Sequence, residues 1–155
     1  MPNRFMARAI ELAVRNARSG RGGPFGAVVV KGGKIIAEGA NVVAATNDPS
    51  AHAEVVAIRK ACRRLRSFQL TGCRIYTSCE PCPMCLGAIY WARPEAVYYA
   101  STKRDAARAG FDDSFIYDEL KVTLARRQVP MKPLMRQQAL EAFAAWKANS
   151  QKVEY

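Results

Sequence analysis

Apolar residues near the start of the chain follow a helical pattern and then a strand pattern. Small and apolar side chains recur at helical spacing over residues 3–19, and Gly20 follows as a stop signal. A β-branched run over residues 25–30, a Gly-Gly pair at 32–33 and a second run over 34–38 are typical of two strands joined by a tight turn. The pattern therefore predicts a packed first helix followed by a β-hairpin.

The middle of the chain repeats a helix and a strand twice. Asp48 followed by Pro49 is typical of a helix N-cap with proline at the first helical position, which predicts a helix that ends near Leu65. A short strand over residues 74–78 follows, and a second helix that opens with proline is expected over residues 81–92.

The remaining segments complete an α/β arrangement. We expect a buried strand over residues 96–100, an irregular or short-helical region over 101–131, and an amphipathic helix over 134–149. Two hairpin strands followed by two helix-to-strand units predict a three-layer α/β/α sandwich with a central mixed sheet. No internal repeat or low-complexity linker divides the sequence, so we expect a single domain over residues 1–155.

Composition agrees with one ordinary globular domain. Half of the 155 residues are hydrophobic and 24% are charged, which excludes disordered, collagen-like and disulfide-scaffold classes. The longest apolar runs are far shorter than the roughly 20 residues that cross a bilayer, so we expect no membrane segment and no membrane partner. Five cysteines, an odd number without a secretion signal, favour a reducing compartment and hence a cytoplasmic protein.

Positive charge is in clear excess. Lys and Arg number 24 against 13 acidic residues, which gives a net charge of +11 and suggests an anionic partner such as nucleic acid. Every charged residue between Glu54 and Glu80 is basic, and a second basic group lies at residues 126–136. Such groups can neutralise phosphates, but on a helix they are more often a solvated face. The charge therefore leaves a nucleic acid open as a partner without requiring one.

One set of residues has the spacing of a zinc site. His52 is the single histidine of the chain, and Cys82 and Cys85 form a Cys-x-x-Cys pair in the second proline-opened helix. Zinc binds imidazole nitrogen and thiolate sulfur, and a catalytic site uses three such ligands and leaves the fourth position for water. The spacing predicts one zinc ion per subunit. Glu54, two residues after His52, is placed to move protons without being a ligand itself.

Each part of this motif has a plainer explanation when it is taken alone. A lone histidine is often an ordinary core or surface residue, and a lone Cys-x-x-Cys pair is often redox-active or structural. Cys79 is the rival ligand, because a fourth thiolate would close the site and make it structural; its position just past a strand favours core packing instead. Cys62 and Cys73 have no ligand spacing and are expected in the core.

The motifs together resemble the cytidine deaminase superfamily of zinc-dependent deaminases, and within it the small bacterial guanine deaminases. The matching segments are residues 23–28 with Asn41, the His-Ala-Glu run at 52–54, the run 77–92 that holds both zinc-ligand cysteines, the run 110–117 and the terminal Glu-Tyr at 154–155. The resemblance covers most of the chain and implies a cytidine deaminase-like fold. It implies hydrolysis of guanine to xanthine and ammonia, with zinc-bound hydroxide as the nucleophile and Glu54 as the proton shuttle. It also implies a homodimer in which the C-terminal segment, about residues 131–155, can be exchanged between subunits.

The resemblance also implies a set of contacts with a small-molecule purine substrate. Asn41 would hydrogen-bond to the purine edge, while Phe25 and Trp91 would lie against its flat faces. Asp113 would accept a ring N–H that guanine has and adenine lacks, and Tyr155 would reach over the pocket from the neighbouring subunit. The residues that the resemblance places at the substrate are Phe25, Asn41, Ala53, Trp91, Asp113 and Tyr155.

These contacts have structural alternatives. Asn41 follows a strand and can be a turn residue, and the two aromatic residues can be ordinary core. Chain ends are usually frayed, which applies to Tyr155. The acidic residues after position 111 can form a solvated patch; they are Asp112, Asp113, Asp118 and Glu119.

Three other functions stay open from the sequence. A tRNA adenosine deaminase would match the same zinc motifs and would use the positive charge, although the Phe-Asp-Asp run at 111–113 would repel phosphate and the C-terminal tail is not uniformly basic. A guanosine or cytosine deaminase would share the motifs as well. A non-enzymatic zinc module that binds nucleic acid would require Cys79 as a fourth ligand.

Overall fold

The computed structural model describes residues 3–155, and the chain divides between Asp113 and Ser114 into two compact units. The elements of the first unit are α1 (Arg4–Ser19), β1 (Gly26–Lys31), β2 (Lys34–Ala40), α2 (Val43–Thr46), α3 (Ala53–Leu65), β3 (Cys73–Cys79), α4 (Pro83–Ala92), β4 (Ala96–Ser101) and α5 (Lys103–Arg108). The second unit contains α6 (Ser114–Lys121), the short 3-10 helix η1 (Leu124–Arg126) and α7 (Arg136–Ala148).

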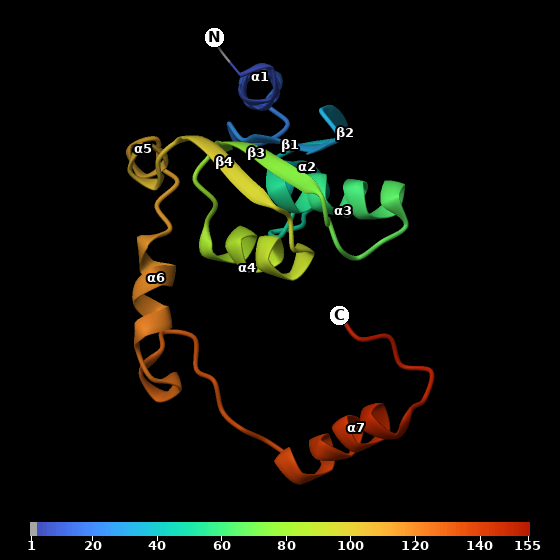
Figure 1. Ribbon diagram of the computed structural model, residues 1–155. Helices are drawn as coiled ribbons and strands as arrows, with labels where there is room; N and C mark the ends of the chain where they lie inside the picture. Colours follow the sequence, from blue (N-terminus) through green and yellow to red (C-terminus); the bar gives the residue numbers. More distant parts are fainter. Residues whose placement is uncertain (1–2) are drawn as a thin grey trace. The chain divides into compact units, whose positions relative to one another are not determined.

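The first unit has three layers built on a four-stranded mixed sheet. The strand order is β2-β1-β3-β4; β1 is antiparallel to both of its neighbours, and β3 and β4 are parallel. Helix α1 covers one face of the sheet, and α3 and α4 cover the other (Figure 1). The expected three-layer α/β/α architecture is confirmed.

Side chains of β1 alternate between the two faces, as the period of a strand requires. Val28 and Val30 pack with Tyr76 on the face beneath α1. Ala27 and Val29 point to the opposite face, where the larger core cluster includes buried residues of α3 and α4. The sheet therefore holds α3 and α4 on one surface, and the start of each helix becomes part of the candidate site.

Helix α1 has the ends that the sequence predicts. The side-chain oxygen of Asn3 accepts hydrogen bonds from the backbone N–H groups of Phe5 and Met6, at 3.0 and 3.1 Å. Gly20 ends the helix in the left-handed conformation, with a φ of 69°. These two caps set where α1 begins and ends.

The start of α3 differs from the prediction. The helix begins at Ala53 and not at Pro49, although its end at Leu65 is confirmed. The Asp48 carboxylate accepts hydrogen bonds from the backbone N–H and the hydroxyl of Ser50, at 2.8 and 2.6 Å, and forms a turn instead of a helix cap. This turn places His52 at the N-cap of α3.

One further boundary and one prediction of burial also differ from the structure. Helix α4 begins at Pro83 with Cys82 as its N-cap, two residues later than expected from Pro81. Strand β4 was expected to be buried, but it lies at the edge of the sheet and exposes Tyr98 by 44% and Tyr99 by 52%. A short apolar run does not distinguish an edge strand from a central one, which explains the second error.

Part of the basic run covers the other edge of the sheet. Lys60 Nζ donates a hydrogen bond to the carbonyl of Glu38 at 3.0 Å, and the Arg64 guanidinium donates to the carbonyl of Ile36 at 3.1 Å. Both carbonyls belong to the edge strand β2, and cationic side chains at such an edge oppose pairing with another chain. Some of the excess positive charge therefore has a structural role.

Gly39 is required where β2 passes α3. A Cβ atom at this position would lie 2.1 Å from the carbonyl oxygen of Ala53 and 2.7 Å from the backbone nitrogen of Ala57. We expect Gly39→Ala to lower the free energy of unfolding by about 1–3 kcal/mol, the usual cost of overpacking. Urea titration followed by circular dichroism measures the change, and an unchanged midpoint would contradict the close approach.

The second unit is helical, and its α7 confirms the predicted terminal helix to within two residues at each end. Apolar side chains of α7 are partly exposed within this unit: Leu140 by 39%, Phe143 by 64% and Trp146 by 40%. Across residues 3–155, none of the helices combines the length and the apolar character that crossing a membrane requires.

Candidate active site

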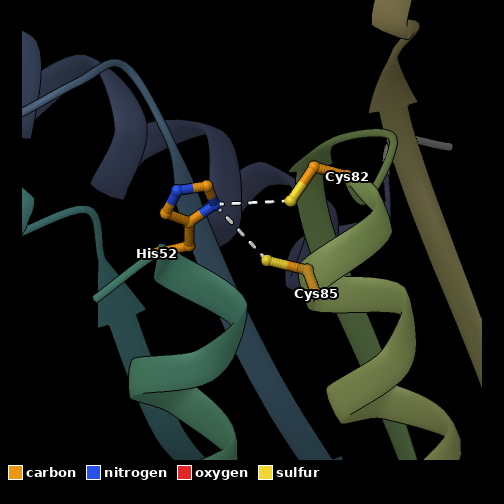
Figure 2. Close-up of side chains that lie close together, drawn as sticks. All are labelled: His52, Cys82 and Cys85. Carbon is orange, nitrogen blue, oxygen red and sulfur yellow. Dashed lines mark hydrogen bonds between the residues drawn. The ribbon is translucent and has the colours of Figure 1, made fainter. Parts of the chain in front are cut away.

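The starts of α3 and α4 bring three metal-binding side chains together. His52 is the N-cap of α3, Cys82 is the N-cap of α4, and Cys85 lies in the first turn of α4. The Nδ1 atom of His52 lies 3.6 Å from the Sγ of Cys82 and 3.5 Å from the Sγ of Cys85 (Figure 2). All three ligand atoms lie within 4.8 Å of one another.

These distances fit a zinc ion. Zinc–sulfur bonds of about 2.3 Å and zinc–nitrogen bonds of about 2.0–2.1 Å at tetrahedral angles separate nitrogen from sulfur by about 3.6 Å. Among residues 3–155, this is the one group of three or more potential ligands that lie close enough to share an ion. The donor set of one imidazole and two thiols is also the chemistry that zinc prefers.

Cys79 does not belong to this group. Its Sγ lies 3.7 Å from the carbonyl oxygen of Thr102, and the side chain is buried. The site therefore has three protein ligands and not four, which is typical of a catalytic and not of a structural zinc centre. Cys73 is fully buried in the core and Cys62 packs against it, as expected.

The surroundings of Cys82 favour the thiolate form. A hydrogen bond from the Cys85 thiol, and then one with His52, lower the pKa of Cys82 well below the ordinary thiol value. Its place at the N-terminus of α4 acts in the same direction, because unpaired backbone N–H groups stabilise negative charge there. The thiolate is the form that binds a metal.

Glu54 is a buried carboxyl beside the three ligands. Its side chain is 6% exposed, and the Thr77 hydroxyl donates a hydrogen bond to Oε1 at 3.2 Å. The other oxygen, Oε2, lies 3.5 Å from the Sγ of Cys85. Burial raises the pKa of Glu54, which moves it toward the range in which a carboxyl can both take and return a proton near neutral pH.

A cavity of about 210 Å³ opens beside these groups, within the first unit. Six residues predicted for the site line it: Phe25, Asn41, His52, Glu54, Cys82 and Asp113. Six more residues that the sequence argument did not assign to the site also line it: Cys79, Glu80, Lys103, Ala106, Phe111 and Asp112. Phe111 and Asp112 stand next to Asp113 in the run 110–117, and the place of that run in the family resemblance was the signal available for them.

The ring of Phe25 meets the ring of Phe111 edge to face in the lining of the cavity. The two centroids are 5.0 Å apart and the planes are inclined by 86°. Such aromatic pairs gain free energy beyond their buried area. They give the cavity a rigid apolar wall that suits a flat ring.

Polar groups of the cavity complement that wall. The side-chain oxygen of Asn41 accepts hydrogen bonds from the backbone N–H groups of Gly23 and Val43, at 3.4 and 3.3 Å, so its amide N–H groups are what it can offer to a ligand. Asp113 offers a carboxylate acceptor, and burial raises its pKa. The cavity thus offers both a donor and an acceptor to a heterocycle.

Three predicted substrate residues do not line the cavity. Ala53 is fully buried in the core as the first residue of α3. Trp91 lies on α4 with 64% of its surface exposed, which excludes the alternative of ordinary core packing. Tyr155 belongs to the second unit and is 68% exposed there.

Comparisons with known proteins agree with the geometry. Residues 2–101 match the family model for the cytidine and deoxycytidylate deaminase zinc-binding region. The chain is 57% identical to guanine deaminase from Bacillus subtilis (strain 168) over 151 residues, which cover 97% of each protein. The X-ray structure of guanine deaminase from Bacillus subtilis superposes with a TM-score of 0.96 at 56% identity, covering 100% of this chain and 99% of that one. The tRNA-specific adenosine deaminase of Aquifex aeolicus (strain VF5) is 46% identical over 78 residues, which cover 50% of this chain and 52% of that protein.

Proposed function

The chain belongs to the family of cytidine and deoxycytidylate deaminases with a zinc-binding region, and from this premise we propose that it hydrolyses guanine to xanthine and ammonia. The observation that carries the proposal is the 57% identity with a guanine deaminase over 97% of both proteins. The cavity supports it, because a metal site, a buried carboxyl and an aromatic wall lie together at one cavity.

His52, Cys82 and Cys85 would hold the zinc ion. When bound, zinc supplies a positive charge that lowers the pKa of a water molecule and makes a nucleophile available near neutral pH. Glu54 takes a proton as water adds to C2 of guanine, passes a proton to the ring nitrogen, and delivers one to the departing amine. Water and guanine thus become xanthine and ammonia.

The walls of the cavity select and orient the base. The aromatic wall formed by Phe25 and Phe111 contacts the base, and the Asn41 amide donates a hydrogen bond to a purine acceptor. Asp113 accepts a ring N–H from guanine, whereas the bare acceptor at N1 of adenine would face the carboxylate unfavourably. Sites that pair with a polar group discriminate strongly against a ligand that lacks it.

A substrate panel tests the proposal. Ammonia release is measured with guanine, guanosine, adenine, cytosine, cytidine and a tRNA anticodon stem-loop, and we expect turnover with guanine. Glu54→Gln serves as the blank for contaminating activity. Turnover confined to the RNA would overturn the assignment.

The second candidate function is deamination of adenosine in tRNA. The net charge of +11 and the 46% identity with a tRNA-specific enzyme over half of the chain favour it. Against it, Lys60 and Arg64 are bound to the edge of the sheet, and Asp112 and Asp113 line the cavity where a phosphate backbone would approach. Both of these observations favour guanine over tRNA as the substrate.

We further propose a homodimer that exchanges the C-terminal segment, about residues 131–155. The exposed apolar residues of α7, together with Tyr90 and Trp91 on α4, support an additional interface, because soluble chains rarely expose apolar patches without use.

The free state of all five cysteines supports a cytoplasmic location, where thiols stay reduced.

Tyr155 is proposed to complete the cavity from the neighbouring subunit, through its hydroxyl or its chain carboxylate. We expect deletion of Tyr155 to lower kcat/KM for guanine about tenfold, the equivalent of one lost hydrogen bond to the substrate, with little change in melting temperature. Deletion of the terminal residue affects few packed atoms, so thermal denaturation is the control for folding. Unchanged kinetic constants would make the C-terminus an ordinary frayed end.

A further inference from the structure

Asn16 is a buried polar side chain in the last turns of α1. It is 8% exposed and lies on the same helix face as Ala9 and Ala13, which pack against the sheet. A buried amide costs free energy unless its hydrogen bonds are made. Its role therefore depends on the groups that it binds.

The single amide nitrogen of Asn16 binds two different segments of the chain. Nδ2 donates to the carbonyl of Gly23 at 2.8 Å and to the carbonyl of Asn41 at 2.7 Å. Both N–H groups of the planar amide are used, so the two carbonyls are fixed relative to each other. Asn41 follows strand β2, and Gly23 precedes strand β1.

These two segments carry the substrate-facing walls. The backbone N–H of Phe25 donates to the carbonyl of Gly23 at 2.9 Å, and the backbone N–H of Asn41 donates to the carbonyl of Phe25 at 3.2 Å. The side-chain oxygen of Asn41 accepts from the backbone N–H of Gly23. The segment that carries Phe25 is therefore hydrogen-bonded to the segment that carries Asn41, and Asn16 binds both segments at this junction.

The junction of these two segments is closely packed. A Cβ atom on Gly22 would lie 2.1 Å from the carbonyl oxygen of Asn41 and 3.1 Å from Nδ2 of Asn16. The Asn41 carbonyl is thus held between the Gly22 backbone and the Asn16 amide. A change at either side would move Asn41 relative to the cavity that it lines.

We propose that Asn16 is a positioning residue for substrate binding: its amide, outside the cavity, fixes the Asn41 side chain and the Phe25 ring in the geometry that binds a purine base. This inference rests on the proposed function, since it concerns the affinity for guanine. It predicts that Asn16 acts on binding and not on the proton transfers of Glu54.

The test measures guanine affinity by isothermal titration calorimetry in the Glu54→Gln background, where turnover does not interfere. We expect Asn16→Ala to raise the Kd for guanine about tenfold. In the enzyme with Glu54 intact, the same change should raise KM by a similar factor and leave kcat within about twofold. Asn16→Ser, which keeps a hydroxyl donor, serves as the milder variant if Asn16→Ala does not fold.

Arg8→Met is the matched control for stability. Arg8 also joins α1 to β2, through two 2.8 Å hydrogen bonds to the Glu38 carboxylate, but it does not line the cavity. Its loss should lower the melting temperature and leave the Kd for guanine unchanged. An equal loss of affinity in Arg8→Met would reduce Asn16 to a general stabilising residue and overturn the proposal.

A double-mutant cycle identifies the route of the effect. Because Asn16 acts partly through the Asn41 side chain, adding Asn16→Ala to Asn41→Ala should raise the Kd for guanine by clearly less than Asn16→Ala does alone. Full additivity, or an unchanged Kd in Asn16→Ala alone, would overturn the inference. Failure of the Glu54→Gln protein itself to bind guanine would contradict the proposed function instead.

Discussion

Replacing Glu54 with glutamine should abolish guanine turnover while the fold and the zinc content stay unchanged. Glutamine has nearly the same size, and its oxygen can still accept the hydrogen bond from the Thr77 hydroxyl that Glu54 accepts at 3.2 Å. It cannot take a proton from water or return one to the substrate. Loss of a general acid–base group costs about 10²–10⁴-fold in rate, and Glu54 serves in more than one transfer.

The measurement is kcat for ammonia release, together with zinc content per chain and melting temperature. Thr77→Val is an informative companion, because it removes the hydroxyl that orients Glu54 and keeps the proton-transfer group. We expect Thr77→Val to retain part of the activity that Glu54→Gln loses. A Glu54→Gln protein with near-normal turnover would remove Glu54 from proton transfer.

The metal site was predictable because its information is local in the sequence. The Cys-x-x-Cys spacing places Cys82 and Cys85 in one helical turn, and the side-chain types define the metal chemistry. The pairing of that turn with His52 came from the combined motif, and the structure places the atoms 3.5–3.6 Å apart. Residue type and spacing were sufficient here.

Helix and strand limits were less predictable where two local structures compete for the same residues. Asp48 can cap a helix or close a turn with Ser50, and the structure takes the turn. The exposure of Tyr98 and Tyr99 depends on the position of β4 at the edge of the sheet, which its own residues do not encode. Local chemistry allowed both outcomes, and the tertiary arrangement decided between them.

Contacts between distant segments were the least predictable. Phe111 reaches Phe25 across 86 positions of the sequence, and Asn16 reaches Asn41 across 25. Neither pair has a spacing signal, because the sheet and the helices packed on it create the proximity. For Trp91 the sequence offered substrate stacking or core packing; the exposed side chain excludes core packing within this chain, and stacking on the substrate stays a prediction.

Removing zinc should abolish activity and leave the chain folded. His52, Cys82 and Cys85 sit at the starts of two helices that already pack on the sheet through a separate apolar core. A metal that binds only the folded protein stabilises it by mass action, so chelation should lower the melting temperature without unfolding the chain at 25 °C. A structural zinc module would instead unfold when its metal is removed.

Dialysis against a chelator, followed by assays of turnover and far-ultraviolet circular dichroism, separates these outcomes. Added zinc should restore turnover, because the ligands remain in place. Cys85→Ala should reproduce the loss permanently, whereas Cys62→Ala, which removes a half-buried thiol that is not in the ligand group, should keep zinc and activity. With three protein ligands, the site would leave a fourth coordination position on zinc for water. Loss of activity on chelation would show that the reaction needs the water that zinc activates there. Full turnover in the metal-free protein would exclude zinc from the reaction, and unfolding on chelation would favour the structural module over the enzyme.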